Sequence, residues 1–352
     1  MPVPHDAMIV GWDLGGAHTK AALVDCRGRV GSVVQIACPL WQGLDHLDAG
    51  IDSVLEKIGD DSGLRHAVTM TGELVDLFPD RATGVKTLID TMSRRFPQAE
   101  LAIYGGSAGF LKPDSAANQA LQVASANWLA SASWAAGCLR EGLLVDVGST
   151  TTDLIPFADK QVLTCDYSDH QRLTGQSLIY TGIVRTPLMA VTDKVPFAGE
   201  WVYLMAEHFA TTADIYRLNG ELPEGADLLP SADNGEKSQI GSARRLARML
   251  GLDLDAADLD NWRGISRFIA EQQLRLVADA CERLLSRPGL SDTAPLVGAG
   301  VGRFLVERIC RRLGRSYIGF ESLFDYANPV ASKVAECAPA VAVASLAKEH
   351  AG

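Results

Sequence analysis

The sequence predicts a two-lobed α/β protein, and three observations carry that prediction. The chain has 352 residues, of which 47% are hydrophobic, and this is enough for two packed lobes with sizeable cores. Short apolar runs that are typical of strands alternate with helical patterns along the chain. Three separated glycine-rich segments lie next to strand patterns, where backbone N–H groups can approach an anion. A small or disordered module is therefore excluded.

The overall charge is acidic, which limits the class of ligand. The formal net charge is −11 and the isoelectric point about 5.1, so we expect no nucleic-acid partner and favour small-molecule chemistry. The seven cysteines are scattered without a C-x-x-C pair, which is typical of free thiols in a reducing compartment. Residues 1–10 have no signal-peptide pattern, and no run reaches the ~18 apolar residues of a membrane span. We expect a cytoplasmic protein with no membrane segment, and the sequence leaves open whether it forms a homodimer.

The first lobe is predicted to begin with a β-meander. Met8–Trp12 and Ala21–Val24 are short apolar runs on either side of a glycine-containing turn, and Val30–Ala37 has a third strand pattern. Leu44–Ile58 carries apolar residues at helical intervals and is expected to place one face on the sheet. The other elements expected in this lobe are strands at His66–Met70 and Leu101–Tyr104 and a buried, alanine-rich helix at Ala126–Leu139.

The second lobe is predicted to begin at about Arg140. Lobe I then comprises residues 1–139, completed by a C-terminal helix in 338–352, and lobe II comprises residues 140–337. Glu141–Gly142 ends the helical pattern, and a strand follows at Leu143–Val147. The polar stretch Glu221–Lys237 is interpreted as a surface loop. The other elements expected in lobe II are helices at Gly241–Leu250, Ser266–Ser286 and Phe304–Leu313 and a strand at Ala294–Val297, and the helix expected to complete lobe I is Ala338–Lys348.

The first glycine-rich segment is Asp13-Leu14-Gly15-Gly16-Ala17-His18-Thr19-Lys20. Adjacent glycines let backbone N–H groups approach phosphate oxygens, and Asp13 can hold Mg²⁺ through water, since Mg²⁺ takes only one or two carboxylates. A plain Gly-Gly hairpin is the simpler alternative. The candidates in this segment are Gly15, Gly16, His18 and Thr19 for phosphate binding, Lys20 as a catalytic cation, and Asp13 as a catalytic residue and metal ligand.

The second segment, Asp146–Asp153, repeats the Asp-x-Gly arrangement and adds hydroxyl groups that can donate to phosphate oxygens. Asp146, a second candidate metal ligand, and Asp153 are candidate catalytic residues seven positions apart. A continuous strand would place them on opposite faces, so only a turn between them permits a shared site. A solvated Ser/Thr-rich turn is the alternative. The phosphate-binding candidates here are Gly148, Ser149, Thr150, Thr151 and Thr152.

The third segment, Gly298-Ala299-Gly300-Val301-Gly302, follows a strand and precedes a helix. Gly298, Gly300 and Gly302 are therefore candidates for binding an anion or a nucleotide. The spacing is not G-x-G-x-x-G, which argues against a dinucleotide-binding fold. The seven histidines contain no H-x-x-x-H or H-E-x-x-H pattern, which argues against a zinc site.

Together the three segments resemble phosphate loop 1, phosphate loop 2 and the adenosine loop of the superfamily that contains actin, sugar kinases and heat-shock chaperones. Ala126–Leu139 and Ala338–Lys348 occupy the positions of its two connecting helices. The resemblance implies an α/β actin-like ATPase (ribonuclease H-like) fold, with two lobes and a central cleft.

Within that superfamily, Asp13–Lys20 and Gly148–Leu154 resemble signatures of the hydantoinase A/oxoprolinase family. Thr71–Arg81, Thr211–Leu218 and Ala243–Met249 are similar to its compact branch, associated with tetrahydromethanopterin-linked one-carbon metabolism and methanofuran biosynthesis. The resemblance implies condensation of two small molecules, an aminomethylfuran-methyl diphosphate and the phenol of tyramine or glutamyl-tyramine, with release of pyrophosphate. Mg²⁺ would assist, and ATP could bind but would not be required.

Other polar residues have both functional and structural interpretations. Glu73 and Asp76 can lie near the cleft or on a solvated helix face, and Arg81 and Lys86 can bind phosphate or a surface carboxylate. Asp214 is a candidate catalytic base or metal ligand, and it also fits a helix N-cap pattern. The remaining group, Arg244, Arg245 and Arg248, occupies two helix faces, so at most two of the three can share a pocket.

Two rival functions remain open at this stage. An ATP-dependent small-molecule kinase would need a carboxylate base, which Asp153 or Asp214 could supply, and a hydantoinase-like ATP hydrolase would ordinarily be larger or have a partner subunit. A nucleotide-sensing regulator or a chaperone would need an appended domain. We expect neither a regulator nor a chaperone, because little sequence precedes Asp13 and the chain ends at Gly352.

Overall fold

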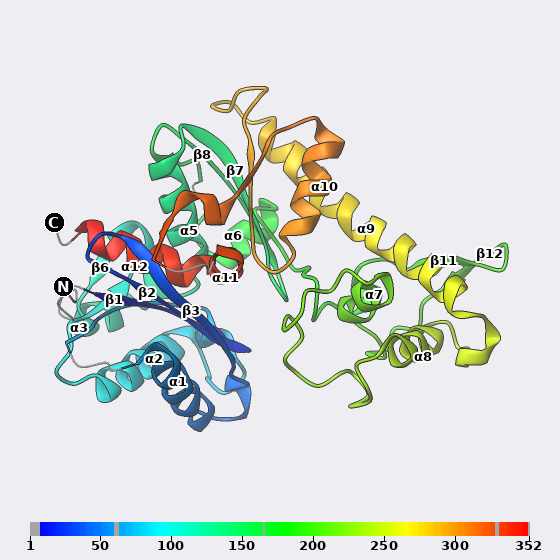
Figure 1. The fold of residues 1–352 in the computed structure, drawn as a ribbon, viewed down its shortest axis with the longest axis horizontal. Helices are drawn as coiled ribbons and strands as arrows, with labels where there is room; N and C mark the ends of the chain where they lie inside the picture. The colour runs from blue at the N-terminus through cyan, green and yellow to red at the C-terminus, as the bar shows by residue number, and fades with distance from the viewer. Residues whose placement is uncertain (1–7, 60–62, 165, 328–330, 351–352) are drawn as a thin grey trace. The chain divides into compact units, whose positions relative to one another are not determined.

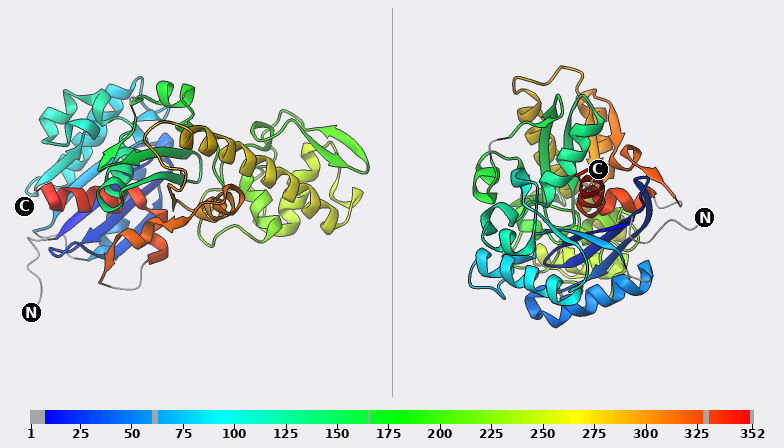
Figure 2. Two further views of the ribbon diagram at one scale, coloured as in Figure 1. Left: turned by 90° about the horizontal axis from the view of Figure 1, so that it is seen from above. Right: turned by 90° about the vertical axis from the view of Figure 1, so that its left-hand side faces the viewer.

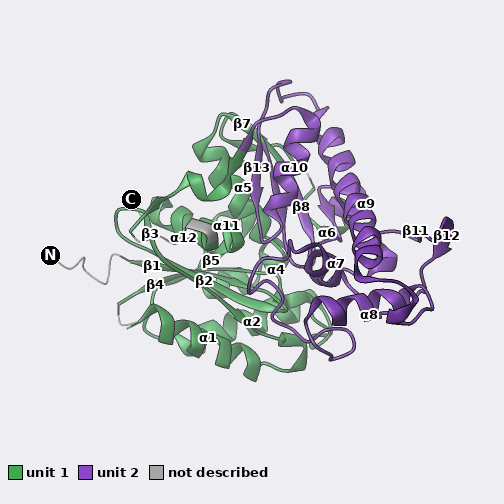
Figure 3. Cartoon of the chain, turned by 45° about the vertical axis from the view of Figure 1, so that its right-hand side comes forward, with its two compact units in different colours: residues 1–142, 155–171, 318–352 green, residues 143–154, 172–317 purple. Residues whose placement is uncertain are grey.

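The computed structural model describes residues 8–59, 63–164, 166–327 and 331–350, and it divides into two compact units (Figure 3). Unit 1 comprises residues 1–142, 155–171 and 318–352, and unit 2 comprises residues 143–154 and 172–317. Residues 155–171, which the sequence assigned to lobe II, group with unit 1, where β9 (Gln161–Val162) packs against α5 (Asn127–Cys138).

Unit 1 is built on a seven-stranded sheet whose order is β15-β3-β2-β1-β4-β5-β6. The first three strands form an antiparallel meander, as predicted, whereas β4 and β5 continue the sheet in parallel with β1. Asp13 lies near the end of β1, opposite Lys20 on β2. The strand bounds are β1 Ile9–Leu14, β2 His18–Val24, β3 Arg29–Ala37, β4 Arg65–Met70, β5 Leu101–Tyr104, β6 Phe110–Leu111 and β15 Asp325–Tyr326.

Helices cover both faces of this sheet (Figure 1). On one face, α1 (Asp45–Ile58) and α2 (Arg81–Arg95) bury a core with Trp12 and Leu14 of β1. On the other face, α12 (Ala338–His350) packs on β1 and α5, and its many buried alanines allow this close approach. The shorter elements of unit 1 are η2 Leu40–Gln42, η3 Gly72–Leu74, η4 Gly106–Ala108, α3 Pro113–Ala117, α4 Ala120–Val123, η7 Phe320–Leu323 and α11 Ala331–Glu336.

The second sheet has the strand order β10-β8-β7-β13-β14, with β9 paired to β8. A turn joins the ends of β7 and β8 at residues 148–151, where the sequence predicted one. β13 pairs with β7 in parallel. The strand bounds are β7 Glu141–Val147, β8 Thr152–Ala158, β10 Leu178–Ile179, β13 Leu296–Ala299 and β14 Tyr317–Gly319.

Most of unit 2 packs around one long helix, α9 (Leu259–Leu285). It passes from α10 to the hairpin β11–β12 (Figures 1 and 2). The helix begins seven positions before the predicted Ser266, because the Asp258 side chain caps it at the N–H of Asn261 and Trp262 is buried in its first turn. The other elements are α6 Asp169–Thr174, η5 Leu188–Ala190, β11 Lys194–Phe197, β12 Glu200–Tyr203, α7 Thr212–Asn219, α8 Gln239–Met249, η6 Leu254–Ala256 and α10 Arg303–Leu313. Across the described ranges, none of the helices has both the length and the apolar character of a membrane span.

Candidate active site

Phosphate loop 1 is the hairpin turn between β1 and β2 in unit 1. The N–H of Gly15 donates to the His18 carbonyl at 3.0 Å, so the turn closes on itself. The N–H of Leu40 donates to the Gly16 carbonyl, also at 3.0 Å, and ties the turn to the segment after β3. The segment therefore forms a Gly-Gly hairpin, and this hairpin places Asp13 beside its turn.

Side-chain alternation along β2 separates the candidates of loop 1. Lys20 lies opposite Asp13, and its Nζ donates to the carbonyl of Glu336 at 2.9 Å. His18, two residues away, is on the same face and nearly buried. Thr19 is fully buried on the opposite face, where its Oγ1 would lie only 3.4 Å from a Cβ built on Gly50 of α1. The structure thus brings Asp13, His18 and Lys20 to one face, whereas the Thr19 hydroxyl lies in the core.

Asn127 contacts Asp13 and was not identified from the sequence. It begins α5, and its Nδ2 donates to Asp13 Oδ1 at 3.4 Å. An asparagine at the start of a predicted helix was the available signal. Asp13 is 5% exposed, and a single carboxylate oriented by an amide suits Mg²⁺, which keeps most of its waters. The described ranges contain no cluster of three or more His, Cys, Asp or Glu residues that could hold a metal.

Phosphate loop 2 is the turn between β7 and β8. The N–H of Gly148 donates to the Thr151 carbonyl at 2.9 Å and closes the turn. Ser149, Thr150 and Thr151 are partly exposed on it, and the Ser149 and Thr150 hydroxyls are 3.4 Å apart. Thr152 is fully buried, and its hydroxyl donates to the Thr181 carbonyl at 2.7 Å. Three of the four residues are therefore partly exposed, whereas the Thr152 hydroxyl is used by the fold.

A segment that the sequence analysis did not single out, residues 181–186, holds this turn in place. Ile183 donates its N–H to the Gly148 carbonyl at 3.1 Å, and Arg185 donates its N–H to the Ser149 carbonyl at 2.9 Å. A Cβ on Gly182 would lie 2.5 Å from Thr150 N and 2.6 Å from Gly148 O, so only glycine fits between the two backbones.

Buried side chains fix Gly182 in turn. Its carbonyl accepts hydrogen bonds from Gln273 Nε2 and from the Thr212 hydroxyl, both at 2.8 Å. Gln273 also accepts a hydrogen bond from the Tyr216 hydroxyl. These partners come from α7 and α9, so only the folded chain reveals this support.

The third glycine-rich segment adjoins loop 2 within unit 2. Ala299 pairs with Asp146, and the N–H of Gly302 donates to the Val147 carbonyl at 2.8 Å. Gly300 has a φ of 80°, and a Cβ there would overlap the Val147 carbonyl and the Asp146 carboxylate. Gly298 lies inside β13, where it packs against the Tyr317 ring. Asp146, Gly300 and Gly302 are thus neighbours, while Gly298 serves strand packing.

Asp153 and Asp214, the two other candidate catalytic carboxylates, are both engaged by arginine. Asp153 pairs at 2.5 Å with Arg172, whose side chain is 2% exposed. Asp214 accepts the N–H of Thr211 at 3.1 Å in a capping box on α7, and its other oxygen pairs with buried Arg245 at 2.7 Å. The helix-cap interpretation of Asp214 is confirmed, and its catalytic role stays a prediction.

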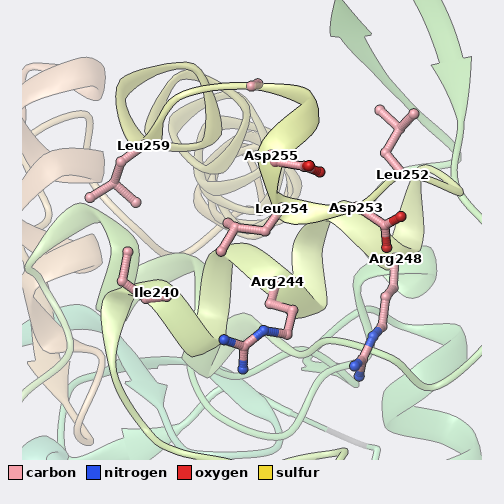
Figure 4. A pocket seen from close by; sticks show the side chains of 9 residues that line it. Ile240, Arg244, Arg248, Leu252, Asp253, Leu254, Asp255 and Leu259 are labelled. Carbon is pink, nitrogen blue, oxygen red and sulfur yellow. The ribbon is translucent and has the colours of Figure 1, made fainter.

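The arginines of α8 divide as their positions on two faces predicted. Arg245 is buried against Asp214, whereas Arg244 and Arg248 are exposed. Figure 4 shows these two extending from one face of α8 at a pocket that Asp253 and Asp255 also line. None of the residues that line it belongs to a glycine-rich segment.

Four other charged residues, which had both a functional and a structural interpretation, differ in their exposure and in their contacts. Asp76 and Lys86 are exposed, as their structural interpretation predicted. Arg81 forms an ion pair with Asp169 at 2.9 Å. Glu73 is only 1% exposed, so the solvated-face interpretation is wrong for this residue.

The chain matches a known protein family and proteins that have been named. The hydantoinase/oxoprolinase family matches residues 65–350. A Methanocaldococcus jannaschii protein named (4-{4-[2-(gamma-L-glutamylamino)ethyl]phenoxymethyl}furan-2-yl)methanamine synthase is 30% identical over 294 residues, which are 83% of this chain and 86% of that protein. A Methanococcus vannielii protein of the same name is 27% identical over 174 residues, which are 49% of this chain and 77% of that protein.

The fold is shared with solved structures. The nucleotide-free structure of acetone carboxylase matches with a TM-score of 0.60, covering 96% of this chain and 70% of that chain at 10% identity. Such low identity shows the fold alone, and it confirms the expected α/β actin-like ATPase fold. The family match spans most of the chain, and the Methanocaldococcus relative reaches 30% identity over most of it. The chain therefore belongs to the hydantoinase/oxoprolinase family.

Proposed function

We propose that this protein is a transferase of methanofuran-type cofactor biosynthesis. It joins a furan-methyl group to the phenol oxygen of tyramine or glutamyl-tyramine. The observation that carries the proposal is the 30% identity, over 294 residues, to a synthase whose name describes a phenoxymethylfuran. The ether in that name is the bond that the proposed reaction forms.

The proposed donor is an aminomethylfuran-methyl diphosphate. The bond between the methylene carbon and the diphosphate oxygen breaks, the bond from that carbon to the phenol oxygen forms, and the phenol proton passes to solvent water. The furan ring stabilises positive charge on the methylene carbon as pyrophosphate departs. The leaving group drives the reaction, so no ATP is consumed.

Each unit by itself contains a turn with groups that suit a phosphate or a magnesium ion. Asp13, oriented by Asn127, is the proposed Mg²⁺ ligand in unit 1, and Asp146 beside Gly300 is a proposed ligand in unit 2. Magnesium would neutralise charge that develops on the leaving pyrophosphate. The Ser149, Thr150 and Thr151 hydroxyls can donate to its oxygens. Lys20 contributes positive charge near Asp13.

The ion pairs that Asp153 and Asp214 form favour this function over a kinase. A kinase of this fold needs a carboxylate base beside the acceptor hydroxyl. Asp153 is paired with Arg172, and Asp214 with Arg245, and both arginines are buried. A kinase would need one of these carboxylates to leave its arginine and reach the acceptor hydroxyl.

The proposed setting is the cytoplasm. The six cysteines that the structure describes are all free thiols, which suits a reducing compartment. Whether the protein forms a homodimer is still open and light scattering would decide it, and the absence of a nucleic-acid partner stays a prediction that a filter-binding assay would check.

The deciding experiment incubates the purified protein with Mg²⁺ and two alternative donors. One reaction contains the furan-methyl diphosphate with tyramine or glutamyl-tyramine, and the other contains ATP with the same acceptor. Mass spectrometry of the ether and phosphorus NMR of pyrophosphate and ADP follow both. Ether together with pyrophosphate supports the proposal. ADP with a phosphorylated acceptor would replace it with the kinase.

Substitution of the metal ligand adds a second test. Asp13→Asn removes one carboxylate charge, so turnover should fall by about a hundredfold or more while the circular dichroism spectrum stays unchanged. Asp52→Asn is the matched control, because Asp52 is on the same unit, 55% exposed, in a surface ion pair. Near-normal turnover of Asp13→Asn would remove Asp13 from the site.

A further inference from the structure

Unit 1 contains a line of three hydrogen-bonding side chains beside phosphate loop 1. Ser125 Oγ lies 2.9 Å from Glu73 Oε1 and 3.3 Å from Asp169 Oδ2. Glu73 is 1% exposed and Ser125 is 5% exposed. Asp169 also pairs with Arg81 at 2.9 Å. One serine hydroxyl therefore contacts two carboxyl groups at once.

The number of protons available to these contacts bears on the charge of the two carboxyl groups. A serine hydroxyl has a single proton and can donate it to only one acceptor. Were both carboxyl groups ionised, the second contact would place an oxygen lone pair against a buried carboxylate oxygen. A proton on one of the two carboxyl groups, donated to Ser125 Oγ, would satisfy both contacts.

The surroundings assign that proton to Glu73. The charged groups that face it are Asp169 at the start of α6 and Arg81 at the start of α2. Arg81 pairs directly with Asp169. Burial, together with the charge of Asp169, raises the pKa of the Glu73 carboxyl, outweighing the hydrogen bonds and the Arg81 charge that lower it. Glu73 Oε2 has no hydrogen-bond partner in another described residue, which costs less for a neutral acid than for a carboxylate. With the proton on Glu73, its carboxyl group would donate to Ser125 Oγ, and the Ser125 hydroxyl would donate to Asp169.

The backbone at Ser125 indicates that this contact is held at a cost. Its φ is 52°, in the left-handed region that residues with a Cβ seldom occupy. Ser125 lies between α4, which ends at Val123, and α5, which begins at Asn127. Asn127 in turn donates to Asp13. The strained residue therefore links the Glu73 hydrogen bond to the segment that orients Asp13.

The turn that carries Glu73 also packs directly on loop 1. The N–H of Thr71 donates to the Leu14 carbonyl at 3.0 Å. A Cβ on Gly72 would lie 3.0 Å from that carbonyl and 3.4 Å from the backbone carbon of Gly15. Glu73 thus lies between loop 1 and the start of α5.

We propose that Glu73 is a protonated positioning residue, whose hydrogen bond to Ser125 holds Asn127 in place to orient Asp13 for magnesium pyrophosphate. The proposal for Glu73 rests on the proposed function only for the identity of the ligand, magnesium pyrophosphate. Two consequences follow. A neutral donor can replace Glu73, and loss of its proton at high pH weakens ligand binding.

The test measures binding of magnesium pyrophosphate by calorimetry at several pH values. Glu73→Gln keeps a neutral donor to Ser125, so its affinity should match the wild type near neutral pH and exceed it at high pH. Glu73→Leu and Ser125→Gly lose the hydrogen bond, and each should bind about tenfold more weakly. Glycine at position 125 tolerates the left-handed backbone, so only the hydroxyl is lost. Asp76→Asn, an exposed carboxylate after the same turn, is the matched control and should bind as the wild type does.

Two outcomes would overturn the proposal. Weak binding by Glu73→Gln, equal to that of Glu73→Leu, would mean that an ionised carboxylate is needed. Wild-type affinity in Ser125→Gly would mean that the hydroxyl transmits nothing to Asp13. Because pyrophosphate itself titrates, each variant is compared with the wild type at the same pH.

A second measurement separates this proposal from the proposed function. If the wild type does not bind magnesium pyrophosphate, the ligand is wrong, yet urea unfolding still reports on Glu73. Its raised pKa contributes stability that is full at low pH and is lost as pH rises through the folded-state pKa. Glu73→Gln should lack this loss, so its stability relative to the wild type should increase with pH. A pH-independent difference would show that Glu73 is ionised in the folded protein.

Discussion

Acidification should destabilise unit 1 through one buried imidazole, His66 on β4. The side chain is 1% exposed, its Nδ1 accepts a hydrogen bond from Trp12 Nε1 at 3.0 Å, and its ring stacks on Phe96 with centroids 3.9 Å apart. Burial lowers the pKa of His66 from its usual 6.5 to about 4. The folded protein therefore keeps this ring neutral, with its proton on Nε2, where the unfolded chain would take up a second proton.

The size of the effect follows from the two pKa values. The depressed pKa means that stability is full above about pH 6.5 and is lost as pH falls towards the folded-state pKa of about 4. One pKa unit corresponds to about 1.4 kcal/mol, so the whole loss is ~3 kcal/mol. A domain has only ~5–15 kcal/mol of stability in total, so this loss is readily measured.

The assay is urea unfolding of the wild type and His66→Gln between pH 7 and pH 4.5. Glutamine can still accept the Trp12 N–H but does not titrate, so His66→Gln should lose less stability than the wild type as pH falls. His46→Gln is the matched control, because His46 is a partly exposed residue of α1 in the same unit. Parallel loss of stability in the wild type and His66→Gln would refute the reasoning, because the imidazole would then contribute nothing to the pH dependence.

Three further substitutions test the loops and their supports. Arg172→Met leaves the Asp153 carboxylate without its buried partner and should lower the free energy of unfolding by ~3 kcal/mol, with partial recovery on adding Asp153→Asn. If urea unfolding shows no loss, the ion pair does not stabilise unit 2. Gly182→Ala forces a methyl group into the backbone of loop 2 and should weaken magnesium pyrophosphate binding about tenfold. Unchanged affinity in calorimetry would show that the loop is not held there. Thr19→Val should bind magnesium pyrophosphate as the wild type does, because the Thr19 hydroxyl is buried. Weaker binding by this variant would mean that the Thr19 hydroxyl reaches the phosphate.

Much of the secondary structure could be predicted because its patterns are local. The meander, α1, α5, α8, α10 and α12 lie within a few residues of the predicted ranges. Apolar spacing in these segments is decided by one face packing on a sheet or a neighbouring helix. Helix α2 was not predicted, although Asp80 caps it and Val85, Leu88, Ile89 and Met92 recur at helical intervals. Its threonines and glycine have low helix propensity, and tertiary packing overrides that preference.

The order of the three glycine-rich loops, and with it the fold, could be read from the sequence by itself, because such turns need glycine, hydroxyl and carboxylate residues at fixed spacing. The tertiary structure alone decided which of those groups are buried or paired within the fold. Strand alternation placed Thr19 in the core, the bond to Thr181 removed the Thr152 hydroxyl, and the Arg172 pair engaged Asp153. It also brought Glu73 to Ser125, 52 positions away, and Asn127 to Asp13, 114 positions away. Contacts between residues so distant in sequence depend on how helices pack on the sheet, which no local pattern encodes.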